Sequence, residues 1–165
     1  MDLRFRVFAN ISKPVHEVFE AVADPAKLSC YFTTGGASGR LEEGATVTWD
    51  FHDFPGAFPV HVIEVVPDER IVLEWKANEP GTDYNVTVTM AFKPVDGDAG
   101  RTLVEIAEEG WHETEAALKA SYGNCMGWSQ MLAALKVWVE HGINLREGMY
   151  KLVPPRSRGG GSPQG

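Results

Sequence analysis

One carboxylate is a candidate for chemistry. Glu108 follows Val104 and Ile106 at two-residue spacing, and side chains two apart lie on the same face of a β-strand. If that face is buried, the carboxylate enters an apolar space, where desolvation raises its pKa and suits it to general acid or base catalysis. The alternative is a carboxylate at the end of a strand that reaches solvent.

Other residue patterns that carry chemistry are weak or missing from the sequence. A metal site formed by His52, Asp53 and His61 is conceivable, but the spacing lacks the short paired pattern of established zinc sites. We find no Gly-x-Ser-x-Gly elbow, no Gly-rich phosphate loop before a helix and no convincing Cys–His pair. We therefore expect no metal and no cofactor, and Glu108 is the only candidate catalytic residue.

The region around Glu108 predicts an antiparallel meander of five or six consecutive strands. Apolar and polar side chains alternate in stretches that are separated by turn residues, as in Pro67 to Arg70 and Asp96 to Gly100. The predicted strands are residues 3–11, 46–51, 58–66, 71–76, 86–92 and 102–108. Trp111 and His112 follow the last strand, either at the rim of a cavity or as exposed loop anchors.

Three helices are predicted around these strands. Ser12 with Pro14, and Asp24 with Pro25, are typical starts of two short helices after the first strand. A long amphipathic helix follows the last strand, with an apolar stripe from Trp128 to Ile143. The segment from Glu113 to Ser121 also looks helical. Because glycine costs about 1 kcal/mol inside a helix, we expect a break near Tyr122-Gly123, a start of the long helix around Asn124 and an exit at Gly148.

Length and charge favour one acidic domain. The 165 residues suit a single core over residues 1–153, followed by a flexible tail rich in Pro, Gly, Ser and Arg at 154–165. The formal net charge of -8 argues against nucleic-acid and acidic membrane partners. With no signal-peptide pattern and no membrane-spanning run, we expect a cytoplasmic protein in which Cys30 and Cys125 are reduced core thiols.

Three motifs resemble the START-like (SRPBCC) superfamily. The segment 11–28, ISKPVHEVFEAVADPAKL, resembles the opening of these domains. The segment 62–75, VIEVVPDERIVLEW, looks like a strand-turn-strand unit of the subgroup named for the activator of Hsp90 ATPase, and Gly127-Trp128 with Leu132, Leu135 and Val139 is similar to its last helix. The resemblance implies an α+β helix-grip (Bet v 1/START-like) fold, a curved antiparallel sheet wrapped around a long C-terminal helix with an internal cavity.

The resemblance implies a function inside that cavity. We expect binding of a small hydrophobic or amphipathic ligand without catalysis; the alternatives are a cyclase or hydrolase that uses the same cavity, and a chaperone-associated module that contacts Hsp90. A homodimer is possible. Strand parity and the helix stripe select the predicted lining residues, which the same pattern could also make plain core: Trp49, Phe51, Val62, Leu73, Trp75, Val88, Met90, Val104, Ile106, Glu108, Trp128, Met131 and Leu132.

Overall fold

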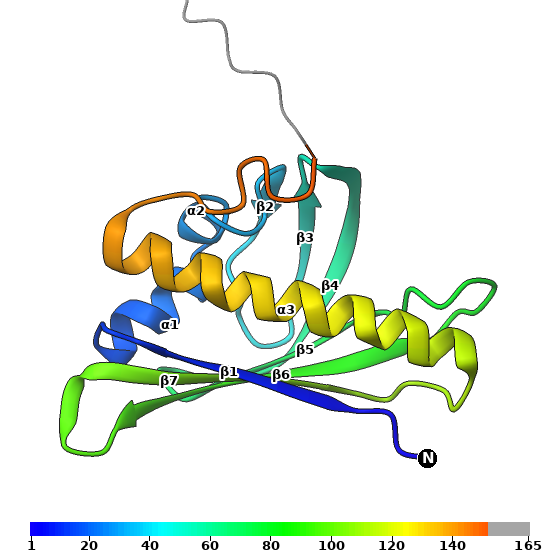
Figure 1. Cartoon of the computed structure of the whole chain (residues 1–165), viewed down its shortest axis with the longest axis horizontal. Coiled ribbons are helices and arrows are strands. Elements are labelled where there is room, and N and C mark those ends of the chain that lie inside the picture. Colours follow the sequence, from blue (N-terminus) through cyan, green and yellow to red (C-terminus); the bar gives the residue numbers. More distant parts are fainter. Residues whose placement is uncertain (152–165) are drawn as a thin grey trace, which may run out of the picture.

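The computed structural model describes residues 1–151, and the predicted tail lies outside this range (Figure 1). The strands are β1 (Phe5–Ile11), β2 (Gly36–Ser38), β3 (Thr46–Phe51), β4 (Phe54–Val66), β5 (Arg70–Lys76), β6 (Asn85–Val95) and β7 (Asp98–Glu109). The helices are α1 (Val15–Ala23), α2 (Pro25–Leu28) and α3 (Glu115–His141). The two predicted short helices therefore follow the first strand.

All seven strands form one antiparallel sheet in the order β1-β7-β6-β5-β4-β3-β2. The predicted meander thus extends from β2 to β7, and β1 joins it at the β7 edge. The turn between β6 and β7 is shorter than the sequence predicted, because Val95 pairs with Asp98 and only Asp96 and Gly97 lie between them. Gly97 has φ +76, which suits a two-residue hairpin turn.

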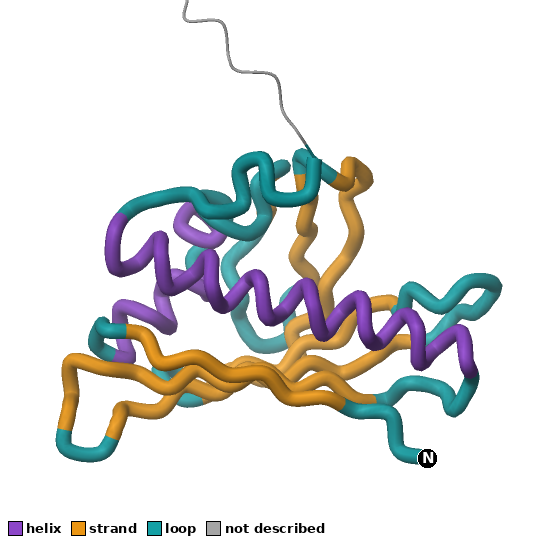
Figure 2. Tube along the Cα trace, in the orientation of Figure 1, coloured by secondary structure: helices purple, strands orange, loops and turns teal. Residues whose placement is uncertain are grey.

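The sheet curves, and α3 lies across its concave side. Register shifts occur between Trp49 and Phe51 and between Val62 and Glu64, and such irregularities bend strands. Figure 1 shows β3 and β4 rising away from the layer formed by β1, β7, β6 and β5. Figure 2 shows the helices on the same side of this layer. The predicted helix-grip fold is confirmed.

The short helices begin with different capping chemistry. Asp24 caps α2 as predicted, because its side chain accepts a hydrogen bond from the Ala26 amide at 2.9 Å. The predicted cap at Ser12 is wrong. Pro14, with extended backbone angles, occupies the N-cap of α1, and the Ser12 amide instead donates to the Glu140 carboxylate at 3.2 Å.

Helix α3 begins earlier and also ends earlier than the sequence predicted. It runs from Glu115 to His141 without a break at Gly123. Thr114 caps it by accepting from the Ala117 amide at 3.0 Å, and burial of Ala117 and Ser121 stabilises the first turns. The helix ends at Gly142, which has a left-handed φ of +70, so the predicted exit at Gly148 is wrong.

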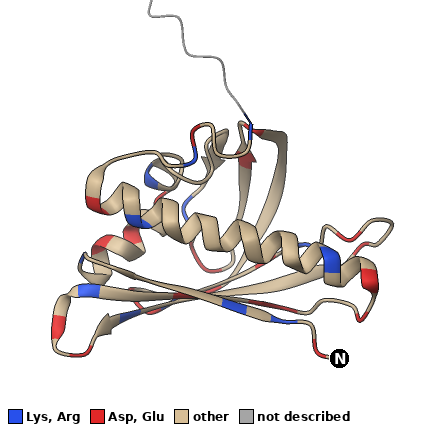
Figure 3. Ribbon diagram, viewed as in Figure 1, with Lys and Arg blue, Asp and Glu red and all other residues tan. Residues whose placement is uncertain are grey.

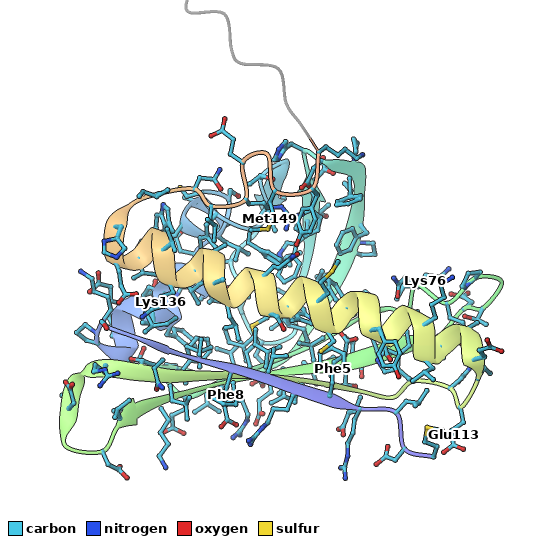
Figure 4. All side chains as sticks on the ribbon, in the orientation of Figure 1. Phe5, Phe8, Lys76, Glu113, Lys136 and Met149 are labelled. Carbon is cyan, nitrogen blue, oxygen red and sulfur yellow. The ribbon has the colours of Figure 1, made fainter. Side chains whose placement is uncertain are left out.

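The main core lies between α3 and the sheet, and a smaller cluster lies beneath the start of the helix. The smaller cluster contains Leu3, Ala77, Val86, Trp111 and Ala117. Figure 3 shows charged residues near both ends of α3 and none along its middle. Phe8 points away from the helix on the opposite side of the sheet and is largely exposed (Figure 4).

Two further features are the positions of the cysteines and the character of the helices. Both thiols are free, as predicted, but Cys30 is exposed and Cys125 is half-buried, so the expectation of core positions is wrong. Among the described residues, no helix combines the length and apolar character needed to cross a bilayer.

Gly123→Ala tests whether α3 is continuous. Gly123 is exposed, and a Cβ atom there meets nothing within 4 Å. We expect the free energy of unfolding, measured with urea, to rise by about 1 kcal/mol because alanine favours the helix. Gly142→Ala is the matched control and should lower stability, since φ +70 strains an alanine. No gain for Gly123→Ala would support the break that the sequence suggested.

Candidate functional site

Aromatic side chains occupy the space between the concave face of the sheet and the first half of α3. Trp128 of α3 packs against Phe32 and Trp75, with ring centroids 5.5 and 5.2 Å away. Trp49 lies 5.6 Å from Phe32 and 6.0 Å from Trp75. We define the aromatic cluster as Phe32, Trp49, Phe51, Phe58, Trp75 and Trp128.

The structure brings all the predicted lining residues into one core. Phe51 and Trp75 are partly buried, and the others are buried. The strand residues share the concave face because β5, β6 and β7 pair directly: Leu73 lies opposite Val88, and Met90 lies opposite Ile106. Their role in binding a ligand stays a prediction.

Two members of the aromatic cluster are absent from the predicted set. Phe58 shares strand parity with Val60 and Val62 on β4, so the alternation could have identified it. Phe32 lies in the irregular segment after α2, where no periodicity applies, yet it contacts Trp49, Phe51 and Trp128. Its only sequence signal is an aromatic pair, Tyr31-Phe32, directly after a short helix.

The rings of the aromatic cluster pack directly against one another, with neighbouring centroids 5.1 to 6.0 Å apart. Two hollows of about 340 and 300 Å³ lie elsewhere. The larger lies beside Leu3 and Leu118, and the smaller lies beside Phe19 and Arg40. Neither of these two hollows is lined by the aromatic cluster.

Glu108 lies at the inner side of the aromatic cluster and is fully buried. Its Oε1 atom accepts a hydrogen bond from Nδ2 of Asn124 at 2.9 Å, and its Oε2 atom accepts one from Nε1 of Trp128 at 3.0 Å. The inward orientation follows strand parity, and the alternative of a strand-end carboxylate in solvent is wrong. Both donors come from α3, one helical turn apart.

Burial raises the pKa of the Glu108 carboxyl above its ordinary value. The N–H donors of Trp128 and Asn124 oppose this shift because they stabilise the ionised form. The indole N–H groups of Trp75 and Trp111 also lower this pKa, although neither makes a hydrogen bond of good geometry. In the described part of the chain, Glu108 has no salt bridge.

A second buried polar group lies at the opposite side of the cluster. The Nη2 atom of Arg146 donates to Oδ1 of Asp53 at 3.0 Å, and both residues are buried. The guanidinium carbon lies 4.5 Å from the Phe51 ring centroid and 5.7 Å from that of Phe32. Sequence reasoning missed this pair because it extended the last helix to Gly148.

Arg146 belongs to residues 142–151, which we call the C-terminal strap. The strap turns back from the end of α3 and passes over α2 and β2 to the top of β3 and β4 (Figure 1). Its residue Met149 lies above the helix in Figure 4. Tyr150 packs edge-on against Phe54 with ring centroids 5.6 Å apart. The strap therefore covers one end of the aromatic cluster.

Residues after β7 and residues of the loop between β5 and β6 form a separate polar cluster. Glu79 accepts hydrogen bonds from the hydroxyl groups of Thr114, at 2.5 Å, and Tyr84, at 2.8 Å. These two bonds lower the pKa of Glu79. The His112 ring stacks on Tyr84, whereas Trp111 is buried in the smaller core cluster. Trp111 is therefore not an exposed loop anchor.

The conceivable metal site does not assemble. His52 contacts the Thr34 hydroxyl, His61 bonds to the Thr46 hydroxyl at 3.0 Å, and Asp53 pairs with Arg146. Within residues 1–151, no group of three or more His, Cys, Asp or Glu side chains is placed to hold a metal ion.

The raised pKa of Glu108 predicts a pH-dependent stability. The folded protein holds the proton of Glu108 more tightly than the unfolded chain does, where the carboxyl group has its ordinary pKa of 4.5. The stability that Glu108 contributes is therefore full below about pH 4.5 and is lost as pH rises through the folded-state pKa. The unfolding free energy of the wild type minus that of Glu108→Gln should fall over this range, measured with urea from pH 4.5 to 8.

Glu105→Gln is the control for that measurement. Glu105 lies on the same strand with the opposite parity and pairs with Arg6 at 3.2 Å. A difference between wild type and Glu108→Gln that stays constant with pH, or that grows, contradicts a raised pKa.

Comparisons with known proteins agree with this architecture. Protein SSP2350 from Staphylococcus saprophyticus has a TM-score of 0.72 at 25% identity, over 87% of this chain and 96% of that one. DynU16 from the dynemicin biosynthetic locus has a TM-score of 0.70 at 26% identity, over 86% of this chain and 49% of that one. The Aha1 dimer from Colwellia psychrerythraea has a TM-score of 0.69 at 20% identity, over 85% and 98% of the two chains.

A comparison with curated proteins gives no match. The family model described as "Activator of Hsp90 ATPase homolog 1-like protein" matches residues 12–140. This range includes α1, the whole meander and nearly all of α3. The chain therefore belongs to the family of Activator of Hsp90 ATPase homolog 1-like proteins.

Proposed function

We propose that this protein binds a small hydrophobic or amphipathic molecule between the concave face of the sheet and the first half of α3. One observation carries the proposal: a buried carboxylate with directed hydrogen bonds lies against a cluster of aromatic rings. Small-molecule sites are commonly apolar with a few placed polar groups. An interior that served packing alone would need no ionisable group, since burying one is costly.

One indole group of the cluster supports the proposal. The Nε1 atom of Trp49 is buried without a hydrogen-bond partner among the described residues. Buried polar groups nearly always have partners, and a ligand that carries an oxygen acceptor would supply one. The family and its relatives support the same interior as the place of binding, because the helix-grip architecture extends over most of the chain.

Trp128→Phe tests this location. The variant keeps an aromatic ring beside Phe32 but loses the N–H that bonds to Glu108. We expect ligands found by native mass spectrometry, from a library of apolar and amphipathic molecules, to bind about tenfold more weakly, since the N–H that holds the Glu108 carboxyl group in place beside the proposed site is lost. Changes in tryptophan fluorescence should report the same loss.

The matched control is Trp138→Phe on the same helix. Trp138 stacks on Tyr31 at 5.5 Å, in the half of α3 that we assign to packing. Binding should survive this change. Equal affinities for wild type, Trp128→Phe and Trp138→Phe would place the ligand elsewhere.

A second candidate function is catalysis by Glu108 in the same interior. The raised pKa favours it, because a carboxyl group that holds its proton more tightly than usual is better suited to act as an acid. For a substrate found by the ligand screen, Glu108→Gln should lower turnover by about 100-fold or more, and Glu105→Gln should leave it unchanged. Unaltered turnover in Glu108→Gln excludes Glu108 as acid or base.

A further inference from the structure

The Asp53–Arg146 pair has unused hydrogen-bonding capacity. The two side chains share one hydrogen bond, from Nη2 of Arg146 to Oδ1 of Asp53 at 3.0 Å. The Oδ2 atom of Asp53 and the Nε atom of Arg146 are buried and have no partner in the described part of the chain. An arginine and a carboxylate commonly form two parallel bonds, so this pair leaves one acceptor and one donor free.

Packing does not explain the incomplete pair. Desolvating two charges is expensive, and apolar residues of similar size often stabilise a protein as well as a buried ion pair does. Here the pair retains that cost and adds two unsatisfied atoms, which native structures rarely keep without a reason. The unpaired acceptor and donor indicate a partner that can both donate and accept.

The position of the pair connects it to the proposed ligand interior. The Arg146 guanidinium lies against Phe51 and Phe32, and Phe32 stacks on Trp128. On its other side the guanidinium lies 4.8 Å from the Tyr150 ring centroid in the strap. A molecule that displaced cluster rings could therefore present one end to Arg146 while its body stayed among aromatic side chains.

We propose that Asp53, together with Arg146 of the C-terminal strap, forms a polar subsite for the uncharged hydroxyl or amide head of an amphipathic ligand. This inference rests on the proposed function, because the apolar body of the ligand lies in the aromatic cluster. A hydroxyl group that accepts a hydrogen bond from Nε of Arg146 and donates one to Oδ2 of Asp53 would give both atoms the partner that they lack.

The charge of the pair excludes ionised heads. Asp53 and Arg146 neutralise each other, so an anionic head that took the guanidinium would leave a buried carboxylate unpaired, which is costly. A cationic head would leave the guanidinium unpaired in the same way. The subsite therefore selects neutral polar heads over both charges.

Three naphthalene probes test the head preference at pH 7. 2-Naphthol donates and accepts, 2-methoxynaphthalene only accepts, and 2-naphthoate is an anion. By native mass spectrometry and calorimetry, wild type should bind 2-naphthol at least about tenfold more tightly than either other probe. Equal affinities for all three, or binding of none of them, overturns the inference.

Two sets of variants assign the preference to the pair. The double variant Asp53→Leu, Arg146→Met replaces the pair by apolar side chains, a change that proteins often tolerate at buried ion pairs. Its affinities for 2-naphthol and 2-methoxynaphthalene should become equal. The matched control, Glu64→Leu with Arg70→Met, changes a half-exposed ion pair between β4 and β5 and should keep the wild-type preference. A tenfold preference that persists in the Asp53→Leu, Arg146→Met variant overturns the inference.

Asp53→Asn gives an independent reversal test. The variant leaves Arg146 as a lone buried cation, so 2-naphthoate should now bind more tightly than 2-naphthol. An unchanged order of affinities contradicts the subsite.

The proposed function fails separately, when neither these probes nor the wider ligand library binds the wild type. Ligands that bind in a Trp128-dependent manner, but without any head preference, leave the proposed function standing and remove only the subsite.

Discussion

The hydrogen bonds between Glu108 on β7 and the first half of α3 determine how the interior is organised. A buried carboxylate without such donors would be costly, so Asn124 and Trp128 must face it, one helical turn apart. This requirement sets the rotation of the helix over the sheet. It places the Trp128 ring between Phe32 and Trp75, and Phe32 in turn contacts the guanidinium of Arg146. Helix, sheet and strap are thus connected through one series of contacts.

The aromatic cluster consequently has a different polar group on each side. Trp75 and Trp128 border the Glu108 carboxyl group, whose pKa is raised. Phe32 and Phe51 border the Asp53–Arg146 ion pair, whose two charges neutralise each other. Aromatic rings tolerate both neighbours because their faces attract cations and their indole N–H groups donate to anions. An elongated molecule bound there, as we propose, would therefore meet different chemistry at its two ends.

Periodicity explains why some of this arrangement was predictable. Alternation along the strands placed Glu108 and Trp49 on the inward face, and the apolar stripe placed Trp128 opposite them, because both patterns repeat with the period of the backbone. Phe32 and Arg146 lie in irregular segments, where no period relates position to direction. The start of α3 was misplaced because a local cost at Gly123 was weighed without the cap at Thr114 and the burial of Ala117. Gly142, directly after His141, was an available signal for the end of the helix.

The contacts between aromatic rings in the interior have a consequence for the stability of the fold. An open cavity of about 300 Å³, at about 24 cal/mol per Å³, would cost about 7 kcal/mol, which is comparable to the whole stability of an ordinary domain. A carrier with such a void would depend on its cargo to remain folded. Here aromatic rings pack against one another in this space, so a protein that binds a ligand there, as we propose, would not depend on that ligand to remain folded.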